Sequence, residues 1–528
     1  MGAEAPKFLD QSFNSQRERY SLILEQSHRI RNKEKLTDRE HLARPYPGGD
    51  FDLLAINVPS TYQQGVIPDG EEPPWGMLRI VVTARERFGL KAGILDAHRL
   101  KLQPEEIKNQ ILKTKAKLVG INPTSVNVPE GVLIAEICDE IGIPYILGGI
   151  HATLNPSIAR DDFPKAFAIV RGNGESVIGE VISVALNNSP RSIASGIYYH
   201  DQNVKGRLDY AKKLNPDEVP MVKQNEYIEE PVYSHTVQIR GKEKEIHEAT
   251  LYVTDGCPFG CTFCASPVMV NRGKDKPYLR PRMKKIVDEV EHAVNDVGAD
   301  AIHFLDDMAF IKGENIRDFY RGVAERNLMG KFIWRGLTRA SVILREDFDD
   351  EVMEMMRESG AWKIALGIES GNNEVLKNIK KGITREQSLL AVKKLGLNRI
   401  QVKGFFIMGF PGETEEQIQE TASFIAQLKD VGLTEIGVFQ FKPYPGTSEY
   451  SQLINSRPEI LGRLNYLMRK ETGLTGKAQY RAEQKEAWLP DDLQIAEIPS
   501  GKVREYVLTS LKDFYGESIN IQKGPSCI

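Results

Sequence analysis

Long apolar runs are missing from this chain of 528 residues. Because a membrane-spanning helix needs about twenty consecutive apolar residues, the sequence predicts none. An excess of one charge is also missing, and the formal net charge of -4 gives no general attraction to nucleic acid or acidic membranes. The first residues, Met1 to Pro6, lack the apolar core of a signal peptide. These absences predict a cytoplasmic protein that binds no nucleic acid, and the length predicts two or more domains.

Cysteine is scarce, with five in the whole chain, which argues against a disulfide framework. Cys138 lies in an apolar helical pattern at 132–138, where a buried inert thiol is expected. Cys527 is one residue too close to the end for a prenylation box. The other three cysteines stand together.

Cys257, Cys261 and Cys264 form a C-x3-C-x2-C cluster directly after the apolar stretch 249–253. Cysteine thiolates hold iron–sulfur clusters, and a cubane cluster has four irons, so three cysteines leave one iron open. A structural zinc site is the alternative, but it usually needs a fourth Cys or His at a short spacing. The sequence contains no second pair of that kind. The spacing therefore favours an iron–sulfur cluster with a vacant coordination position.

With Phe263 in the aromatic position, this segment resembles the signature of the radical S-adenosylmethionine (SAM) superfamily. The resemblance implies a 4Fe–4S cluster whose open iron binds SAM, with Phe263 near the adenine. It also implies an external electron donor of the flavodoxin or ferredoxin type. Reductive cleavage of SAM would give a 5′-deoxyadenosyl radical that takes a hydrogen atom from the substrate.

Residues 246–447 alternate strand and helix patterns, with strands expected near 249–254, 301–305, 332–338, 363–369, 402–408 and 435–441. Six such units suit the partial (β/α)6 barrel of the radical SAM core. Catalytic residues of parallel barrels gather where the strands end. There the resemblance assigns five residues to SAM: Asp307, Arg339, Glu369, Ser370 and Gly409. Asp307 could equally cap the following helix, and Glu369 ends an apolar strand, where a carboxylate needs a partner.

Residues 46–200 also alternate short apolar runs with helical patterns, which predicts a doubly wound, Rossmann-like parallel sheet. Ligands of such sheets lie beyond the carboxyl ends of the strands. The turns there resemble the cobalamin-binding domain that precedes the radical SAM core in one large subgroup. The resemblance assigns seven residues to cobalamin: Thr124, Ser125, Gly148, Gly149, His151, Gly172 and Glu175.

One departure from that subgroup concerns the D-x-H-x-x-G motif, whose His ligates cobalt from below. Asp96 to Lys101 imitates its start but has Lys101 in place of Gly, so His98 is expected to be a surface loop residue. The lower face of cobalt would then have no histidine ligand.

Three further segments complete the chain: a helical extension at 1–45, a polar linker at 201–245, and a mainly helical region at 448–528 expected to cap the substrate. The pairing of domains implies a cobalamin-dependent radical SAM C-methyltransferase acting on a small molecule or natural product. Two alternatives stay open. One is a related enzyme that cyclises, contracts or rearranges its substrate without methyl transfer, and the other is a non-catalytic iron–sulfur or zinc protein.

Overall fold

The computed structural model describes residues 50–59, 73–124, 127–187, 189–191, 196–200, 209–228, 231–239, 241–270, 276–464 and 489–516. Three predictions lie outside these residues: the helical extension at 1–45, Ser125 and Cys527. No described helix is long and apolar enough to cross a membrane.

The N-terminal domain is built on a six-stranded sheet with strand order β2-β1-β3-β4-β5-β6. Its first five strands are parallel, and β6 is antiparallel to β5. The strands are β1 (Leu53–Ile56), β2 (Ala92–Leu95), β3 (Val119–Ile121), β4 (Tyr145–Leu147), β5 (Ala168–Val170) and β6 (Ile197–Tyr199). The first five match the predicted apolar runs, and β6 was not predicted. An order of 2-1-3-4-5 is one of the doubly wound arrangements, so the Rossmann-like prediction is confirmed.

The strands of this sheet carry apolar side chains on both faces, so helices cover both faces of the sheet. Leu53 and Ala55 pack on one side with α2 (Trp75–Phe88) and α7 (Ile178–Asn187). Leu54 and Ile56 pack on the other side with α3 (Pro104–Thr114) and α4 (Val128–Ile141). Such strands read as continuous apolar runs, which is typical of parallel sheets. Two short helices, α5 (Gly149–Leu154) and α6 (Pro156–Asp162), follow β4.

The second sheet has seven strands in the order β13-β12-β11-β10-β9-β8-β7. Strands β8 to β13 are parallel and run in chain order, which is the predicted partial barrel. They are β8 (Lys242–Leu251), β9 (Ala301–Phe304), β10 (Ile333–Thr338), β11 (Ala361–Glu369), β12 (Gln401–Met408) and β13 (Leu433–Gln440). The edge strand β7 (Val232–Ile239) pairs antiparallel with β8 and lies in the segment expected to be a linker.

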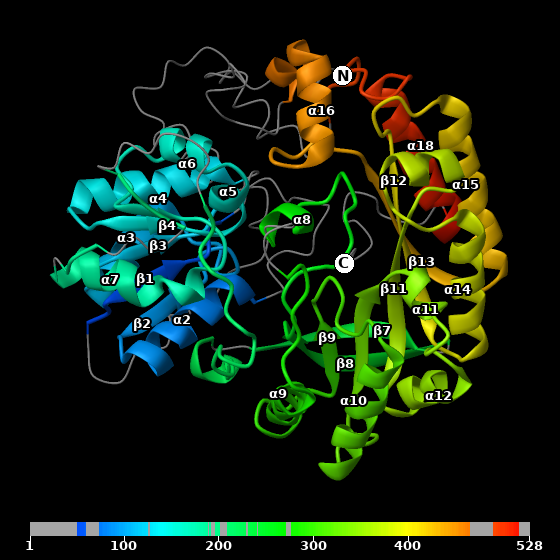
Figure 1. The fold of residues 1–528 in the computed structure, drawn as a ribbon, viewed down its shortest axis with the longest axis horizontal. Coiled ribbons are helices and arrows are strands. Elements are labelled where there is room, and N and C mark those ends of the chain that lie inside the picture. Colours follow the sequence, from blue (N-terminus) through cyan, green and yellow to red (C-terminus); the bar gives the residue numbers. More distant parts are fainter. Residues whose placement is uncertain are drawn as a thin grey trace, which may run out of the picture.

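The longer helices cover the outside of the barrel sheet (Figure 1), and the following helices connect its strands. They are α8 (Ser266–Met269), α9 (Met283–Asn295), α10 (Gly313–Glu325), α11 (Ala340–Ile343), α12 (Asp350–Glu358), α13 (Asn373–Asn378), α14 (Arg385–Leu397) and α15 (Glu415–Asp430). Within the described part of the C-terminal region, three further elements follow β13: α16 (Ser448–Ser456), the 3-10 helix η4 (Pro458–Arg463) and α18 (Ser500–Tyr515).

The last helix, α18, packs against the barrel beside β13 and α15 (Figure 1). Gln440 donates through its side-chain amide to the carbonyl of Ser500 at 2.9 Å, and the Tyr515 hydroxyl bonds both backbone groups of Ile436. The C-terminal region thus supports the strand that ends the sheet. Its expected role as a cap over substrate stays a prediction.

The two sheets lie side by side, with α8 between them in the centre of the molecule (Figure 1). Helix α5 of the N-terminal domain contacts α8 of the barrel domain. Asn155 donates to the carbonyl of Pro445 at 3.4 Å, and Gly446 fits so closely against Leu154 that a Cβ at residue 446 would lie 2.9 Å from the Leu154 Cβ. The C-terminal edge of the first sheet therefore meets loops at the C-terminal edge of the second.

Candidate functional site: a cysteine loop at the mouth of the barrel

The cysteine loop begins where β8 ends, and a buried carboxylate fixes its first residues. Asp306 follows β9 and is fully buried. It accepts hydrogen bonds from the backbone of Val253 at 3.1 Å, from the Thr254 hydroxyl at 2.6 Å, and from the Thr254 amide. Burial raises the pKa of Asp306 to about 6, and these hydrogen bonds oppose that rise. Neighbouring strands thus hold the start of the loop in one position.

Gly256 makes the sharp turn that leads into Cys257. Its φ of 83° is in the left-handed region that favours glycine. A Cβ there would lie 2.3 Å from the Val270 Cγ1 and 2.6 Å from the Pro277 carbonyl oxygen. The preceding residue, Asp255, exchanges both backbone hydrogen bonds with Leu279. The chain is therefore folded tightly on itself immediately before the first cysteine.

The thiols of Cys257, Cys261 and Cys264 are free and half-buried. Burial raises the pKa of Cys257 to about 11 and also raises the pKa of Cys264, and each of these two thiols lies near the other two cysteines. A metal ligand must be a thiolate, so positive charge has to be supplied at this site. A cluster of iron ions supplies it.

The donor set fits a cluster. Among the described residues, no three His, Cys, Asp or Glu side chains are arranged around a single ion. In a cubane cluster each cysteine binds a different iron, so the sulfurs surround a body larger than one ion. Three half-buried thiols from one loop offer one ligand to each of three irons.

Arg339 is a buried cation that interacts electrostatically with Cys257 and Cys261. It follows β10, is 4% exposed, and its guanidinium carbon lies 3.6 Å from the centre of the Phe259 ring. Burial lowers its pKa, while the nearby Cys261, Cys257 and Glu369 raise it. The Arg339 Nε is buried and has no hydrogen-bond partner among the described residues. A buried donor of this kind needs an acceptor, and a carboxylate is the acceptor that arginine binds best.

Two acidic residues from the predicted set flank the cysteines and Arg339. Asp307 accepts a hydrogen bond from the Ser266 hydroxyl at 2.5 Å, and its charge raises the pKa of Cys257 and Cys264. Glu369 ends β11 with a φ of 70°, after a bulge between Gly367 and Glu369. Its carboxylate pairs with Lys381 at 2.7 Å, and both side chains are buried. The partner that Glu369 was expected to need is therefore Lys381, and its contact with SAM stays a prediction.

The aromatic residue between the last two cysteines packs into the C-terminal core. The rings of Phe263 and Phe410 lie 5.5 Å apart, and Phe410 also contacts Phe441. Thr262 donates its amide to the Ile379 carbonyl at 3.1 Å and its hydroxyl to Glu449 at 2.5 Å. These contacts join the cysteine loop to α13 and α16.

The last two predicted SAM residues face other parts of the protein. The Ser370 hydroxyl is fully buried, lies 3.0 Å from the Thr421 hydroxyl, and accepts from the Asn372 amide at 3.1 Å. Gly409 has a φ of 92°, and a Cβ there would lie 2.8 Å from Val503. Both residues are in contact with the protein itself in this structure, so their assignment to SAM stays a prediction.

The predicted cobalamin residues that the structure describes lie beyond the ends of β3, β4 and β5, where such sheets bind ligands. Thr124 bonds Asn127 through its amide and hydroxyl. His151 is buried, and its ring lies 3.1 Å from Asp162. Gly172 donates its amide to the Thr153 hydroxyl, and Glu175 pairs with Arg79. These polar groups already have partners within the protein.

Two glycines at the end of β4 behave differently from each other. Gly149 has a φ of 79°, and a Cβ there would lie 1.5 Å from the Asn122 side-chain oxygen, so the fold itself requires glycine. Gly148 has a φ of -144°, and no heavy atom lies within 4 Å of its ideal Cβ. Neither backbone conformation nor packing explains a glycine at 148. Open backbone at the edge of this sheet fits the approach of a bulky ligand.

Some residues of the site have no motif in the sequence. Lys381 and Thr262 support Glu369 and the cysteine loop, and Arg79 binds Asp255 from the other domain. Arg79 gives one sequence signal, because it is a charged residue within the apolar helical run 77–82. A buried cation there must have a partner, but the sequence does not say which.

This fold and site define a class, the radical SAM enzymes. Residues 251–425 match the sequence model of the radical SAM superfamily, so the chain contains a radical SAM domain, which uses a 4Fe–4S cluster and SAM. The resemblance expected from the cysteine motif is therefore confirmed.

Known proteins similar to this chain include a methyltransferase and a cyclase. An uncharacterized methyltransferase of Pyrococcus horikoshii is 28% identical over 382 residues, which cover 71% of this chain and 77% of that protein. The anaerobic magnesium-protoporphyrin IX monomethyl ester cyclase of Rubrivivax gelatinosus is 27% identical over 350 residues, 63% of this chain and 59% of that protein.

Among solved structures, the radical SAM methyltransferase TsrM from Kitasatospora setae, with cobalamin and a 4Fe–4S cluster bound, has the same fold. It aligns with a TM-score of 0.61 at 16% identity, over 89% of this chain and 90% of TsrM. The predicted combination of a Rossmann-like domain and a radical SAM barrel is therefore confirmed as a fold.

Proposed function

We propose that this chain is a cobalamin-dependent radical SAM methyltransferase that methylates an unactivated carbon of a small molecule or natural product. The observation that carries this proposal is the contact between the two ligand edges. Helix α5, which follows the open glycine Gly148, contacts α8, which follows Cys264. The two expected cofactor loops are therefore next to helices that contact each other where the domains meet.

Different residues of the chain would have different roles in such a reaction. Cys257, Cys261 and Cys264 would hold the cluster, and Arg339 would bind the carboxylate of SAM. When bound, the cluster with SAM supplies a 5′-deoxyadenosyl radical, and cobalamin supplies a methyl group. The packed aromatic rings of Phe263, Phe410 and Phe441 exclude water on one side of the cysteine loop.

The alternative is cyclisation or rearrangement without methyl transfer. Its support is the similarity to the cyclase of Rubrivivax gelatinosus. Both reactions begin with the same radical step, so the described residues of the barrel serve either one. The difference lies in whether a second SAM is consumed as a methyl donor.

Product analysis separates the two. Anaerobically reconstituted protein is incubated with reductant, SAM and hydroxocobalamin, and the products are measured by mass spectrometry. Methyl transfer predicts both 5′-deoxyadenosine and S-adenosylhomocysteine. 5′-Deoxyadenosine alone would favour rearrangement. The absence of both products would contradict the proposal. Replacing the chemical reductant with flavodoxin or ferredoxin tests the expected electron donor.

A further inference from the structure

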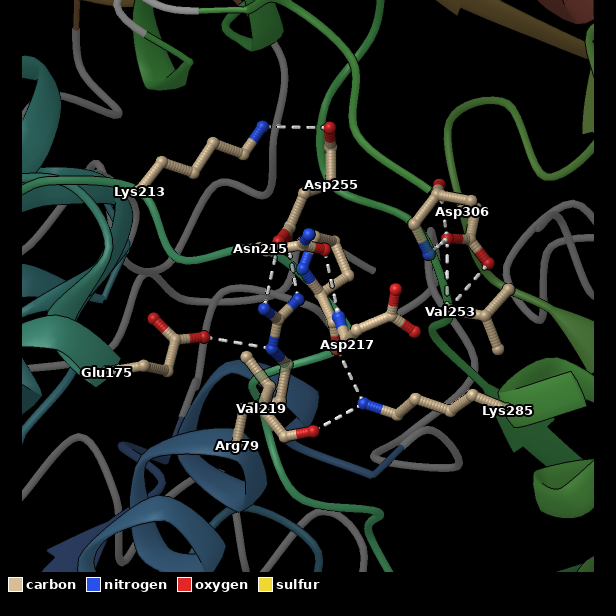
Figure 2. A network of polar contacts seen from close by, with 12 residues as sticks. Arg79, Glu175, Lys213, Asn215, Asp217, Val219, Val253, Asp255, Lys285 and Asp306 are labelled. Carbon is tan, nitrogen blue, oxygen red and sulfur yellow. Dashed lines mark hydrogen bonds and ion pairs between the residues drawn. The ribbon is translucent and has the colours of Figure 1, made fainter. Parts of the chain in front are cut away.

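A single arginine of the N-terminal domain contacts one loop of each domain. Arg79 lies in α2 between Leu78 and Val81, which are fully buried, and is itself 7% exposed. Its guanidinium donates two hydrogen bonds to Asp255, from Nη1 at 2.6 Å and from Nη2 at 2.9 Å. Its Nε lies 2.8 Å from Glu175 as an ion pair (Figure 2).

The two carboxylates belong to different domains and different loops. Asp255 stands two residues before Cys257, at the start of the cysteine loop. Glu175 follows β5, in the stretch that also contains Gly172 at the ligand edge of the first sheet. One guanidinium therefore contacts both loops, and we call Arg79, Glu175 and Asp255 the interdomain clamp.

Other contacts hold the clamp in place from the barrel side. Lys213, in the segment that joins the domains, donates to the Asp255 carbonyl at 2.8 Å (Figure 2). Asp306 fixes Thr254, the neighbour of Asp255. Lys285 of α9 donates to the carbonyls of Pro216 at 2.6 Å and of Val219. The clamp is thus part of a connected polar network rather than an isolated ion pair.

The two carboxylates of the clamp depend on the positive charge of Arg79. Both carboxylates raise the pKa of Arg79 against the effect of burial. Without the guanidinium, the buried carboxylates of Glu175 and Asp255 would both lose the cation that they contact, which is strongly unfavourable. A lysine at 79 would keep the charge but could not bond Asp255 with two parallel N–H groups while also contacting Glu175.

We propose that Arg79 is a positioning residue that couples the cysteine loop to the ligand edge of the N-terminal sheet, so that ordering one loop orders the other. The proposal rests on the proposed function for the meaning of the second loop as a cofactor site. The coupling through the clamp itself can be tested with the 4Fe–4S cluster alone, without cobalamin or substrate. An ordinary structural salt bridge would stabilise the fold without passing an effect from one loop to the other.

Amide hydrogen exchange tests the coupling in the full-length protein, without cobalamin or substrate. Exchange of the amides at 171–177 is compared before and after anaerobic reconstitution of the 4Fe–4S cluster. In the wild type, loading should slow exchange there by about tenfold, because a fixed cysteine loop restrains Asp255, Arg79 and Glu175 in turn. In Arg79→Lys, iron content should stay the same while the slowing falls below about twofold.

Two further variants make the result decisive. Arg87→Lys is the matched control, because Arg87 is on the same helix and its side chain is exposed; it should behave as the wild type. Glu175→Leu removes the acceptor of the Arg79 Nε on the N-terminal side and leaves Arg79 bonded to Asp255, so it serves where Arg79→Lys fails to fold. It should also abolish the slowing at normal iron content.

Equal slowing in the wild type and in these variants, or no slowing in the wild type, would overturn the proposal. The proposed function has separate criteria. If exchange behaves as expected while no S-adenosylhomocysteine forms, methyl transfer is wrong and the coupling stands.

Discussion

The guanidinium of Arg339 lies on the face of the ring of Phe259, a residue of the cysteine loop two positions after Cys257. The Arg339 Nε is buried and has no hydrogen-bond partner among the described residues. The ring holds the cation by its negative face, and the nearby thiols and Glu369 add to the attraction. One donor is thus left for an anion bound beside the cysteines, and the carboxylate of SAM is such an anion.

Arg339→Met should weaken SAM binding without removing the cluster. A hydrogen bond to a charged group contributes about 1.5–3 kcal/mol, so affinity should fall by about ten- to a hundredfold. The measurement is the SAM concentration needed to change the electron paramagnetic resonance spectrum of the reduced cluster. Arg345→Met is the control, because Arg345 is exposed and paired with Asp347. An unchanged SAM titration in Arg339→Met would contradict this role.

Cys261→Ala should abolish the broad visible absorption of anaerobically reconstituted protein and lower its iron content, because one of three cluster ligands is lost. Cys138→Ala should retain both, since Cys138 is fully buried in the N-terminal core. Iron and acid-labile sulfide are measured on both variants. A full cluster in Cys261→Ala, or stoichiometric zinc in the wild type, would refute the assignment of the loop.

Gly256→Ala should also impair cluster assembly, through packing rather than chemistry. The added Cβ would meet Val270 and the Pro277 carbonyl at distances that side chains do not occupy. Gly298→Ala is a close control, because its φ of 84° matches the 83° of Gly256 while no atom lies within 4 Å of its Cβ. Both variants bear a backbone cost of about 1 kcal/mol, and only Gly256→Ala adds the clash. Iron content should therefore fall only in Gly256→Ala.

The turn after β12 makes stability depend on pH. Glu413 is 2% exposed and accepts hydrogen bonds from the amides of Gly409 at 2.6 Å and Phe410 at 3.0 Å, yet burial raises its pKa to about 7. A carboxyl with a raised folded-state pKa binds its proton more tightly in the native state. Its contribution is therefore complete below the unfolded pKa and is lost as pH rises through about 7.

Glu413→Gln should remove this dependence while keeping an oxygen acceptor for the two amides. Relative to the wild type, the variant should gain about 2 kcal/mol in unfolding free energy between about pH 5 and about pH 8. Urea unfolding of the metal-free protein, followed by tryptophan fluorescence, measures the change. Parallel pH profiles for the two proteins would show that Glu413 does not titrate in this range.

The sequence predicts most of this fold because most of the parallel strands contain a short apolar run between polar turns. The prediction of 249–254 covers only the end of β8, because this strand begins with four exposed charged residues, Lys242 to Glu245. The strand β7 escapes prediction because its side chains alternate between exposed and half-buried, so Val232–Ile239 reads as a polar segment. This segment forms a strand because eight of its residues pair with β8, and such tertiary pairing is not encoded in the local sequence pattern.

The residues of the site also differ in whether the local sequence predicts them. The cysteine motif is local, so its chemistry can be predicted from spacing alone. Arg79 and Asp255 are 176 residues apart, and nothing local to either one identifies the other. Glu369 and Ser370 are adjacent in the sequence, but the bulge in β11 turns one toward Lys381 while the other bonds Thr421. Adjacent residues of one motif therefore have different surroundings.

The contacts of Thr262 also bear on how the enzyme matures. This residue sits between Cys261 and Cys264 and is anchored by Ile379 and Glu449, which the ribosome adds long after the three cysteines. A nascent polypeptide that ends before Glu449 already has every sulfur donor but lacks the framework that shapes their loop. Delivery of iron and sulfide is therefore best timed after translation of the barrel is complete.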